Sequence, residues 1–467
     1  MIEFGNLALS TDPCEDLVEI FRHEAHEAMD DFVDKLAPLI ASEKRLTLDE
    51  VSETFQQKRA ELMGTLVEKF IESHHADLIH QDVAPCPRCK KLLKARKQRA
   101  RDVETMHGTV EIGRPYFYCP ECHEGFSPLD AALELSKRKK QNDLQRKALK
   151  LLSRVPFDAA SELFLDLTGI PFSDHSLHEL FASFADQIEI EEVIPSSVEI
   201  EERIKEVSTS RNRPILVVAS DGAMVPTRCK GGRDVKRGPG EYKEAKGFRL
   251  YLISKDRIAH LASWHQIQDT EQFGRDLKLI SERIPKEKVR IALIGDGASW
   301  LWTQMKEAFP GAREILDLYH CSEHLHALAN AQFPNDPTAA LHWVEATMAR
   351  LYFGKISDVI GGLRRMKPVS PDAKEEIRKL ATYLQNNRGR IHYRSDRLGG
   401  YPIGSGGIES ANKFICHARL KISGAWWLKT NSNAMLKLRC SIFNGTFNEV
   451  FANHVTQKKA KQLLTDA

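Results

Sequence analysis

The stretch Ile291-Ala-Leu-Ile-Gly-Asp-Gly-Ala-Ser-Trp300 decides how the rest of the chain is interpreted. Its first four residues form a short apolar run typical of a buried strand, and the run ends at Gly295-Asp296-Gly297. A carboxylate that follows a buried strand between two glycines is well placed to face a cleft at the carboxyl edge of an open sheet. Asp296 is therefore the first candidate functional residue.

Two other acids occur in comparable contexts. The apolar run 214–220 leads into Asp221-Gly222, and Gly404-Ser-Gly-Gly407 leads into a predicted helix that carries Glu409. Each acid has an ordinary alternative, because Asp-Gly often forms only a turn and Glu409 could be a capping or surface residue. As a set, however, Asp221, Asp296 and Glu409 predict a metal-dependent nuclease or strand-transfer site, and we expect them to meet in space.

Three carboxylates in one pocket repel one another unless something cationic lies between them. Oxygen ligands suit Mg²⁺ or Mn²⁺, and two such ions can activate an attacking oxygen and stabilise the leaving oxygen of a phosphodiester. We therefore expect two Mg²⁺ ions (or Mn²⁺), held by the same three acids.

The elements around the acids alternate between strand and helix from about residue 211. Three strands, a helix and a fourth strand are expected at 215–220, 242–254, 258–265, 270–284 and 291–294. This is the order of a ribonuclease-H-like core, in which the first strand is central and the fourth lies beside it. Such an arrangement would bring Asp221 and Asp296 together.

At 467 residues the chain is too long for one ordinary domain. We predict a multidomain α/β protein with a ribonuclease-H-like catalytic core. The expected parts are a helical N-terminal region at 1–80, a zinc ribbon at 81–130, a helical region with a possible helix-turn-helix at 131–195, the catalytic core at 196–325 and 396–445, an all-α insertion at 326–395 and a basic tail at 446–467.

Two cysteine pairs mark the predicted zinc ribbon. Cys86-Pro-Arg-Cys89 and Cys119-Pro-Glu-Cys122 are separated by 29 residues, which a hairpin turning at His107-Gly108 would fill. Four thiolates suit one tetrahedral Zn²⁺, and a closed site of this kind is structural. Disulfides are the alternative, which a reducing compartment disfavours.

A basic run follows the first cysteine pair and makes the ribbon the best candidate for a DNA-contacting surface, although a solvated loop is the simpler interpretation. The residues concerned are Lys90, Lys91, Lys94, Arg96, Lys97, Arg99 and Arg101. Two predicted helices, 158–167 and 176–184, resemble a helix-turn-helix. Most helix pairs with a short turn never contact DNA, so this signal is weak. The acidic stretch 189–202 resembles a linker.

Composition adds little about partners, since the net charge is only +2. We find no run of 18 apolar residues and therefore expect no membrane span. The N-terminus lacks the basic region of a signal peptide. We expect a cytoplasmic protein that is nucleoid-associated when bound to DNA.

The chain resembles bacterial insertion-sequence transposases of the DDE type, specifically the ISKra group. The resemblance extends in order from about residue 80 to 440, through the two cysteine pairs, Arg114-Pro-Tyr-Phe-Tyr118, DGAMVP (221–226), GDGASWLW (295–302), ILDLYHCSEHL (315–325), GSGGIES (404–410) and RLKISGAWW (419–427). It implies a transposase whose catalytic acids are Asp221, Asp296 and Glu409, with an all-helical insertion between the second and third.

Two of these segments carry further candidates. Asp317 and His320 match a polar-x-x-His signature that the resemblance associates with support of the active site or the DNA; a neighbouring cluster that only supports the acids is the simpler interpretation. Arg419, Lys421 and Trp426 follow the Glu409 helix, where a basic and aromatic surface would hold a DNA strand. Core packing is as good an explanation for one of the two adjacent tryptophans.

The leading hypothesis is a DNA transposase that binds double-stranded element ends and target DNA. Because such reactions pair two ends, we expect a homo-oligomer, at least a dimer on DNA. The alternatives are a DNA-binding repressor with silent acids and a hydrolytic nuclease built on the same core.

Overall fold

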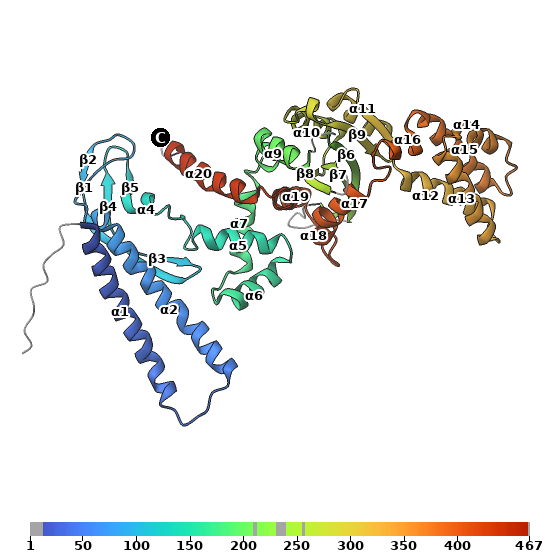
Figure 1. Ribbon diagram of the computed structural model, residues 1–467. Helices are drawn as coiled ribbons and strands as arrows, with labels where there is room; N and C mark the ends of the chain where they lie inside the picture. Colours follow the sequence, from blue (N-terminus) through green and yellow to red (C-terminus); the bar gives the residue numbers. More distant parts are fainter. Residues whose placement is uncertain (1–12, 209–212, 230–239, 255–256, 466–467) are drawn as a thin grey trace, which may run out of the picture. The chain divides into compact units, whose positions relative to one another are not determined.

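The computed structural model describes residues 13–208, 213–229, 240–254 and 257–465 (Figure 1). The chain forms two compact units: residues 1–181 with 453–467, and residues 182–452. It is a mixed α/β, multidomain protein. Within the described residues, every helix is too short or too polar to cross a membrane.

The first unit begins with a helical hairpin. Helix α1 (Pro13–Ile40) packs along α2 (Leu48–His74), and two edge-to-face aromatic pairs, Phe21–Phe70 and Phe32–Phe55, lie between them. Helix α2 begins with a reciprocal capping box, in which the Thr47 hydroxyl accepts from the Glu50 N–H and the Glu50 carboxylate accepts from the Thr47 N–H. The sequence pattern at this helix start is confirmed.

The cysteine module, residues 83–126, follows the hairpin. Its strands are β1 (Val83–Pro85), β2 (Leu92–Lys94), β3 (Lys97–Thr105), β4 (Gly108–Cys119) and β5 (Glu124–Phe126). Strands β3 and β4 form the expected hairpin, which is longer than the sequence indicated because β3 already begins within the basic run. Val103, Val110 and Ile112 from this hairpin pack around Leu129, which gives the module a small apolar core.

Three helices complete the described core of the first unit: α5 (Asn142–Leu152), α6 (Phe157–Thr168) and α7 (Asp174–Ala185), the last of which continues past residue 181. Their positions agree with the periodicity of the sequence to within two or three residues. In the turn between α6 and α7, Phe172 packs edge-to-face on Phe164. The helix pair expected from the sequence is present.

The second unit is built on a five-stranded sheet with the order β10-β9-β6-β7-β8. The strands are β6 (Ile215–Thr227), β7 (Glu241–Ser254), β8 (Arg257–Gln266), β9 (Arg290–Gly295) and β10 (Arg313–Leu316). β6 is central, antiparallel to β7 and parallel to β9. Helices α10 (Thr270–Glu282) and α11 (Ser299–Ala308) cover one face of the sheet, and α17 (Gly406–Ala411) and α19 (Lys429–Asn444) lie on the other (Figure 1).

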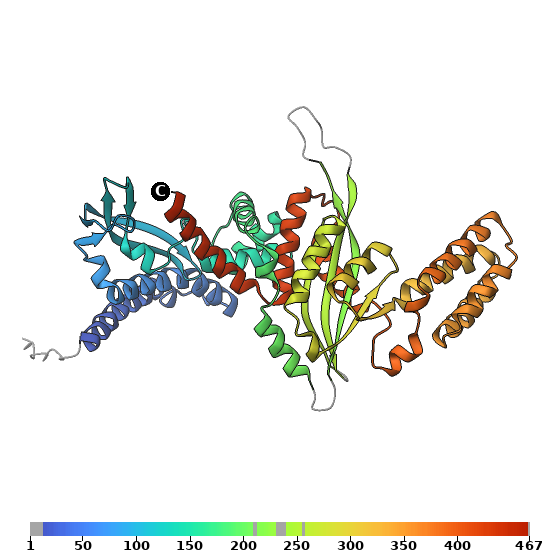
Figure 2. The same ribbon diagram turned by 90° about the horizontal axis from the view of Figure 1, so that it is seen from above.

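One expectation about the first acid is wrong. Asp221 does not end a strand, because β6 continues to Thr227 and stays paired with β7 along its whole length. Only the pairing with β9 stops earlier, at Ala219 opposite Ile294. Figure 2 shows these two long strands, coloured light green, running beyond the rest of the sheet. Asp221 therefore lies where the sheet opens on one side, and the interpretation of Asp221-Gly222 as a mere turn is excluded.

The acidic stretch 189–202 is also not a linker. It forms α8 (Ile190–Val193) and the first part of α9 (Ser197–Val207), and its apolar residues are buried except for Val198, which is 66% exposed. The Asn444 side chain and the Thr446 hydroxyl both donate hydrogen bonds to the Val193 carbonyl. The stretch resembled a linker because half of its acids are exposed, whereas Ile190, Val193 and Ile200 are buried within the second unit.

The predicted insertion is helical. It contains the end of α12 (Leu318–Gln332), α13 (Pro337–Tyr352), α14 (Ile356–Arg365), α15 (Pro371–Asn386) and the start of α16 (Tyr393–Leu398). Because α12 begins at the end of β10 and runs on into this region, the insertion grows out of the core without a break in the helix.

Candidate active site and metal centre

Asp221 lies on β6 at the point where the sheet opens. One carboxylate oxygen accepts a hydrogen bond from the Gly222 N–H at 2.7 Å, and the other accepts from Asn412 Nδ2 at 2.8 Å. Burial raises the pKa of Asp221 to about 6; repulsion from Asp296 and Asp317 adds to the rise, whereas the Gly222 N–H and His320 oppose it. A nearby cation would therefore lower the pKa of this carboxyl group.

Asp296 follows β9, the neighbouring parallel strand. Its carboxylate accepts from the Ala298 N–H at 2.9 Å, and its carbonyl accepts from the Tyr383 hydroxyl at 2.9 Å. Gly297 has φ +103°, and a Cβ there would lie 2.9 Å from the Tyr383 ring, so only glycine fits this turn. Tyr383 belongs to α15, which means that the insertion is anchored directly beside Asp296.

Glu409 is reached through Asp317 and Ser405. Asp317, fully buried, accepts hydrogen bonds from the Ser405 N–H at 2.9 Å and from the Ser405 hydroxyl at 2.7 Å. The Ser405 hydroxyl also lies 3.3 Å from Glu409 Oε1, while the Asp317 N–H donates to the carbonyl of Gly295. Asp317 therefore ties the segment of Asp296 to the helix of Glu409, although more than 80 residues separate them in sequence.

Glycine also brings the Glu409 helix close to the sheet. A Cβ on Gly407 would lie 2.6 Å from the Tyr251 ring on β7. The Gly407 carbonyl accepts a hydrogen bond from Arg249 Nη1 at 2.6 Å. Gly407 is thus explained by a close approach of α17 to β7, which the sequence alone did not indicate.

Two histidines on α12 flank the acids. His320 Nε2 lies 3.9 Å from the Asp317 carboxylate, and its Nδ1 lies 3.1 Å from that of Glu323. His324 packs against the Tyr383 ring at 4.1 Å between centroids. Burial lowers the pKa of His324, and His320 lowers it further. His320 therefore belongs to the same charged neighbourhood as Asp221 and Asp317.

Two residues that the sequence did not single out, Asn412 and His265, orient the Asp221 carboxylate through a chain of hydrogen bonds. Asn412 begins the π-helical segment η3 (Asn412–His417), and its side-chain oxygen lies 2.9 Å from Nε2 of the buried His265 on β8. Burial lowers the pKa of His265 to about 4, so the ring is neutral and donates its Nε2 hydrogen to Asn412. The Asn412 amide nitrogen consequently points at Asp221. No sequence motif marks this chain of contacts, because it joins three distant segments.

The three acids are not gathered into one tight ligand set. Among the described residues, the only group of three or more His, Cys, Asp or Glu side chains with ligand atoms within 4.8 Å of one another is the cysteine group. Asp221, Asp296 and Glu409 border one region through the contacts above, and Glu409 is exposed. Their donor chemistry fits Mg²⁺.

The four cysteines of the module form a group that can hold a metal such as zinc. Cys86, Cys89, Cys119 and Cys122 have sulfur atoms within 4.8 Å of one another. The Cys86–Cys122 and Cys89–Cys119 sulfur distances are 3.9 and 3.6 Å, far longer than a disulfide bond, and all four are free thiols. The disulfide alternative is therefore excluded by this structure.

The cysteine loops are locally organised for a metal. Lys90 and His123, each following the second cysteine of its pair, have positive φ values of 62° and 54°. Burial raises the pKa of the Cys86 thiol, but the N–H groups of Cys89 and Arg88 outweigh this and bring it down to about 7. Because metals bind thiolates, these N–H donors favour the ligating form at Cys86, whereas burial and the neighbouring thiols raise the pKa of Cys122 to about 12.

The basic run lies on the surface of the module, except for Arg101, which is half-buried. Arg96 and Arg99 stack on the rings of Tyr118 and Tyr116, at 4.4 and 3.6 Å from the ring centroids. Lys91 pairs with Glu121 at 2.5 Å, and Arg101 lies 3.8 Å from Asp130. Lys94, Arg96, Lys97 and Arg99 therefore form the exposed basic and aromatic part of the run.

Of the three residues after Glu409 that were predicted to contact DNA, one is buried and two are exposed. Arg419 is only 3% exposed and lies against the Trp427 ring, so it does not fit the predicted direct contact with DNA. Lys421 is exposed, and Trp426 is 42% exposed beside Tyr242. The alternative that one tryptophan packs inward applies to Trp427, whose Nε1 donates to the Leu420 carbonyl.

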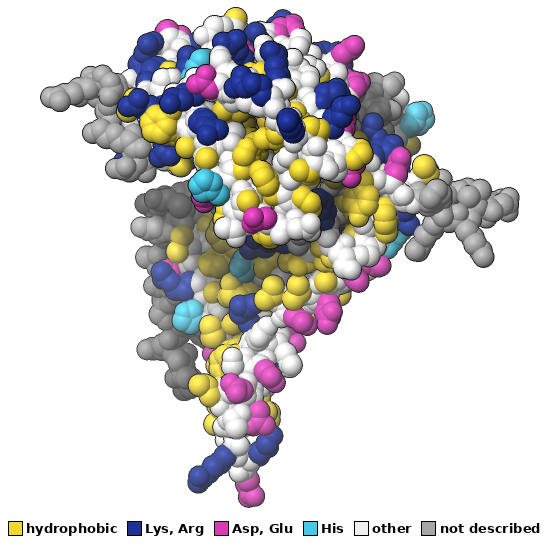
Figure 3. Space-filling model, turned by 90° about the vertical axis from the view of Figure 1, so that its right-hand side faces the viewer, with side chains coloured by type: hydrophobic (Ala, Val, Ile, Leu, Met, Phe, Trp, Pro, Cys, Tyr) yellow, Lys and Arg dark blue, Asp and Glu magenta, His cyan; other side chains and the backbone are white. Residues whose placement is uncertain are grey.

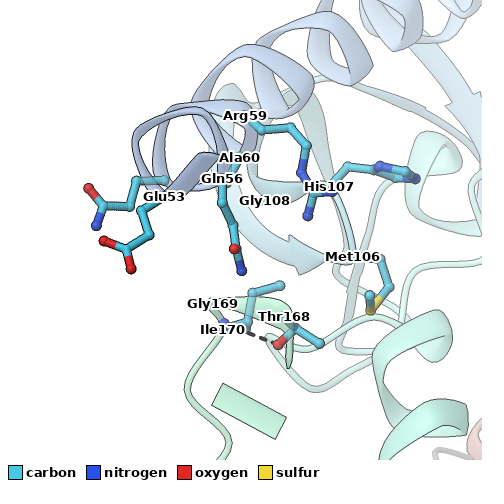
Figure 4. Close-up of a pocket in the computed structure, with 11 residues that line it drawn as sticks. Glu53, Gln56, Arg59, Ala60, Met106, His107, Gly108, Thr168, Gly169 and Ile170 are labelled. Carbon is cyan, nitrogen blue, oxygen red and sulfur yellow. Dashed lines mark hydrogen bonds between the residues drawn. The ribbon is translucent and has the colours of Figure 1, made fainter. Parts of the chain in front are cut away.

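The first unit contains a cavity of about 410 Å³ (Figure 4). It is lined by Glu53, Gln56, Gln57, Arg59, Ala60, Met106, His107, Gly108, Thr168, Gly169 and Ile170. The turn between α6 and α7 is held here by a bond from the Ile170 N–H to the Thr168 hydroxyl. The cavity has no pair of acids and no nucleophile with a base, so we assign no chemistry to it.

The chain belongs to the family described as Uncharacterised protein family (UPF0236), whose model matches residues 41–455. No match was found among curated proteins. A solved structure, the Drosophila P element transposase strand transfer complex, matches 68% of this chain and 82% of its own at 10% identity. The TM-score is 0.26, which does not establish that the two proteins share a fold.

Proposed function

We propose that this chain is a DNA transposase of the DDE type, similar to the ISKra group, with a ribonuclease-H-like core. The strand order with a central β6 and a parallel β9 supports that core. The single observation that carries the proposal is the hydrogen-bonded arrangement at this sheet opening. Asp221 lies on β6 beside β9, which leads into Asp296, and Asp317 is bonded to Gly295 at the end of β9 and to Ser405 before Glu409.

The chain's own residues would prepare this site for a cation. Gly222 and Asn412 fix the Asp221 carboxylate, and Asp317 fixes the position of Glu409 relative to β9. Two Mg²⁺ ions held by Asp221, Asp296 and Glu409 would polarise the scissile phosphate and stabilise the leaving oxygen. Because the acids do not yet form a tight group, binding of cation and DNA would have to draw them together.

The cysteine module is proposed to be a zinc ribbon that contacts the element ends. Its exposed Lys94, Arg96, Lys97 and Arg99 would meet phosphates, and the tyrosines beneath the two arginines hold those guanidinium groups at the surface. Lys421 and Trp426 are proposed to contact a DNA strand beside the Glu409 helix. Pairing of two ends would require at least a dimer.

The decisive experiment is a strand-transfer assay on the element's own terminal DNA with Mg²⁺. The full-length protein should cut and join the DNA, and Asp296→Asn should be slower by about 10³-fold, since loss of a metal-holding carboxylate removes several kcal/mol. Asp186→Asn, which changes an exposed aspartate of the same unit, is the matched control and should remain active.

Other outcomes would replace the proposal. If the DNA is bound but neither Mg²⁺ nor Mn²⁺ supports cutting, a repressor with silent acids is the better function. If the wild type hydrolyses DNA or RNA but never joins ends, the protein is a nuclease. Equal cutting by Asp296→Asn and wild type would show that the chemistry lies elsewhere.

A further inference from the structure

The helical insertion carries far more positive charge than the rest of the chain. Residues 326–395 contain eleven Lys and Arg residues against six Asp and Glu residues, whereas the entire chain has a net charge of only +2. The space-filling view that faces the insertion shows Lys and Arg side chains gathered over its upper part (Figure 3). A basic surface on a nearly neutral protein needs an explanation beyond solubility.

The exposed basic residues lie at both ends of α14. Those concerned are Arg350, Lys355, Arg364, Arg365, Lys367, Arg388 and Arg394. None of them forms an ion pair with another described residue, unlike Arg378 and Lys379 on α15, which pair with Glu375 and Glu376. Their charges are therefore available to an external anion.

Both ends of α14 are structurally defined. At the first turn, Arg388 donates to the Ser357 hydroxyl at 2.7 Å, and nearby Arg394 stacks over Phe353, which is 59% exposed. At the last turn, Arg364 and Arg365 project from the helix. The ten residues of α14 separate the two ends by about 15 Å, which is roughly four base pairs of duplex at 3.4 Å each.

The middle of the solvent-facing side of α14 carries no side chain, because Gly361 lies there. Ser357, Gly361, Arg364 and Arg365 lie on the solvent side of α14, while Ile356, Val359, Ile360 and Leu363 point inward. A Cβ on Gly362 would meet nothing within 4 Å, and one on Gly361 would meet only the flexible end of Arg365 at 3.5 Å. Packing thus gives no reason for two glycines that each cost about 1 kcal/mol relative to alanine in a helix. Because these glycines have no side chains, a binding partner can approach α14 closely between its two basic ends.

We propose that this α14 face, with Gly361 between its two basic ends, binds the phosphate backbone of duplex DNA. The only acid on it is Asp358, in the first turn, where the helix dipole already favours a negative charge. The face belongs to the insertion that is tied to the sheet by the Tyr383 hydroxyl, which donates to the Asp296 carbonyl. The inference rests on the proposed function only in taking DNA as the partner.

The test is fluorescence anisotropy of the full-length protein with a duplex of arbitrary sequence, at several salt concentrations and without cutting. Arg364→Ala/Arg365→Ala should bind more weakly, and the slope of log affinity against log salt should fall by about 2, near one unit for each lost phosphate contact. The matched control, Arg378→Ala/Lys379→Ala, removes the same charge from ion-paired positions and should keep the wild-type slope.

A third variant tests the close approach. Gly361→Gln adds bulk without charge at a partly exposed helical position, and it should weaken binding several-fold while leaving the slope unchanged. Wild-type affinity in Gly361→Gln, or equal slopes for the two double variants, would overturn the inference. Since cutting is not measured, these results are separate from those of the strand-transfer assay.

Discussion

The cysteine group and the carboxylate site are both predicted metal sites, yet the fold prepares them to different degrees. Four sulfur atoms come within 4.8 Å of one another, whereas the three acids do not form such a group. The cysteines sit in two short loops with matching left-handed residues, and neutral thiols tolerate close approach. Carboxylates repel at such distances. A structural metal site can therefore be assembled by local sequence, while a catalytic site of acids stays open until a cation joins it.

The largest expected effect comes from removing one thiol of the cysteine group. Cys119→Ser should lose the bound zinc and unfold the cysteine module, because binding of a structural zinc contributes about 10–16 kcal/mol in small metal domains. Metal analysis of the purified protein should give one zinc per wild-type chain and none per variant chain. Cys229→Ser, at an exposed cysteine outside the group, is the control and should retain its zinc. Full zinc occupancy in Cys119→Ser would refute the four-thiolate site.

The opposite behaviour is expected when a carboxylate is removed. The pKa of Asp221 is raised to about 6 in the folded chain from an ordinary value of 3.8, so the folded state binds the extra proton between these values. The contribution of Asp221 to stability should therefore fall as pH rises from about 4 to about 6 and then level off. Asp221→Asn has no carboxyl group to ionise at this position, so its free energy of unfolding at pH 7 should exceed that of the wild type by about 2–3 kcal/mol.

Urea unfolding at pH 4 and pH 7 without Mg²⁺ measures this difference. The gain should appear at pH 7 and vanish near pH 4, and Asp186→Asn should show no such pH dependence. A loss of stability at pH 7 in Asp221→Asn would mean that the negative charge is already balanced in the fold, which would remove the contrast with the cysteine group.

The smallest expected effect concerns Asn412, whose side chain donates a hydrogen bond to the Asp221 carboxylate. Asn412→Asp replaces the amide donor by a second carboxylate, which repels Asp221 and should raise its pKa further. Strand cutting should fall by about 10–100-fold, as is usual for residues that orient a metal ligand. The rising limb of the pH–rate profile should move to higher pH, which a purely structural defect would not cause. An unchanged profile would leave Asn412 with a packing role alone.

The sequence by itself determined the elements and the parts that depend on short-range pattern. Periodicity placed the helices of the first unit and the strands of the sheet, since apolar spacing is a local property. The capping box at Thr47 and the cysteine pairs required no knowledge of the fold. The strand order expected from the element sequence also agrees with the observed sheet.

Only the tertiary structure decided what surrounds the acids. The extension of β6 past Asp221 depends on the length of its partner β7, and the burial of Arg419 depends on Trp427. Ser405, Asn412 and His265 carry no local signature, because their roles arise from hydrogen bonds between segments up to 191 residues apart. Composition marks what a segment can bury, but a contact between distant segments is fixed only when the whole unit packs.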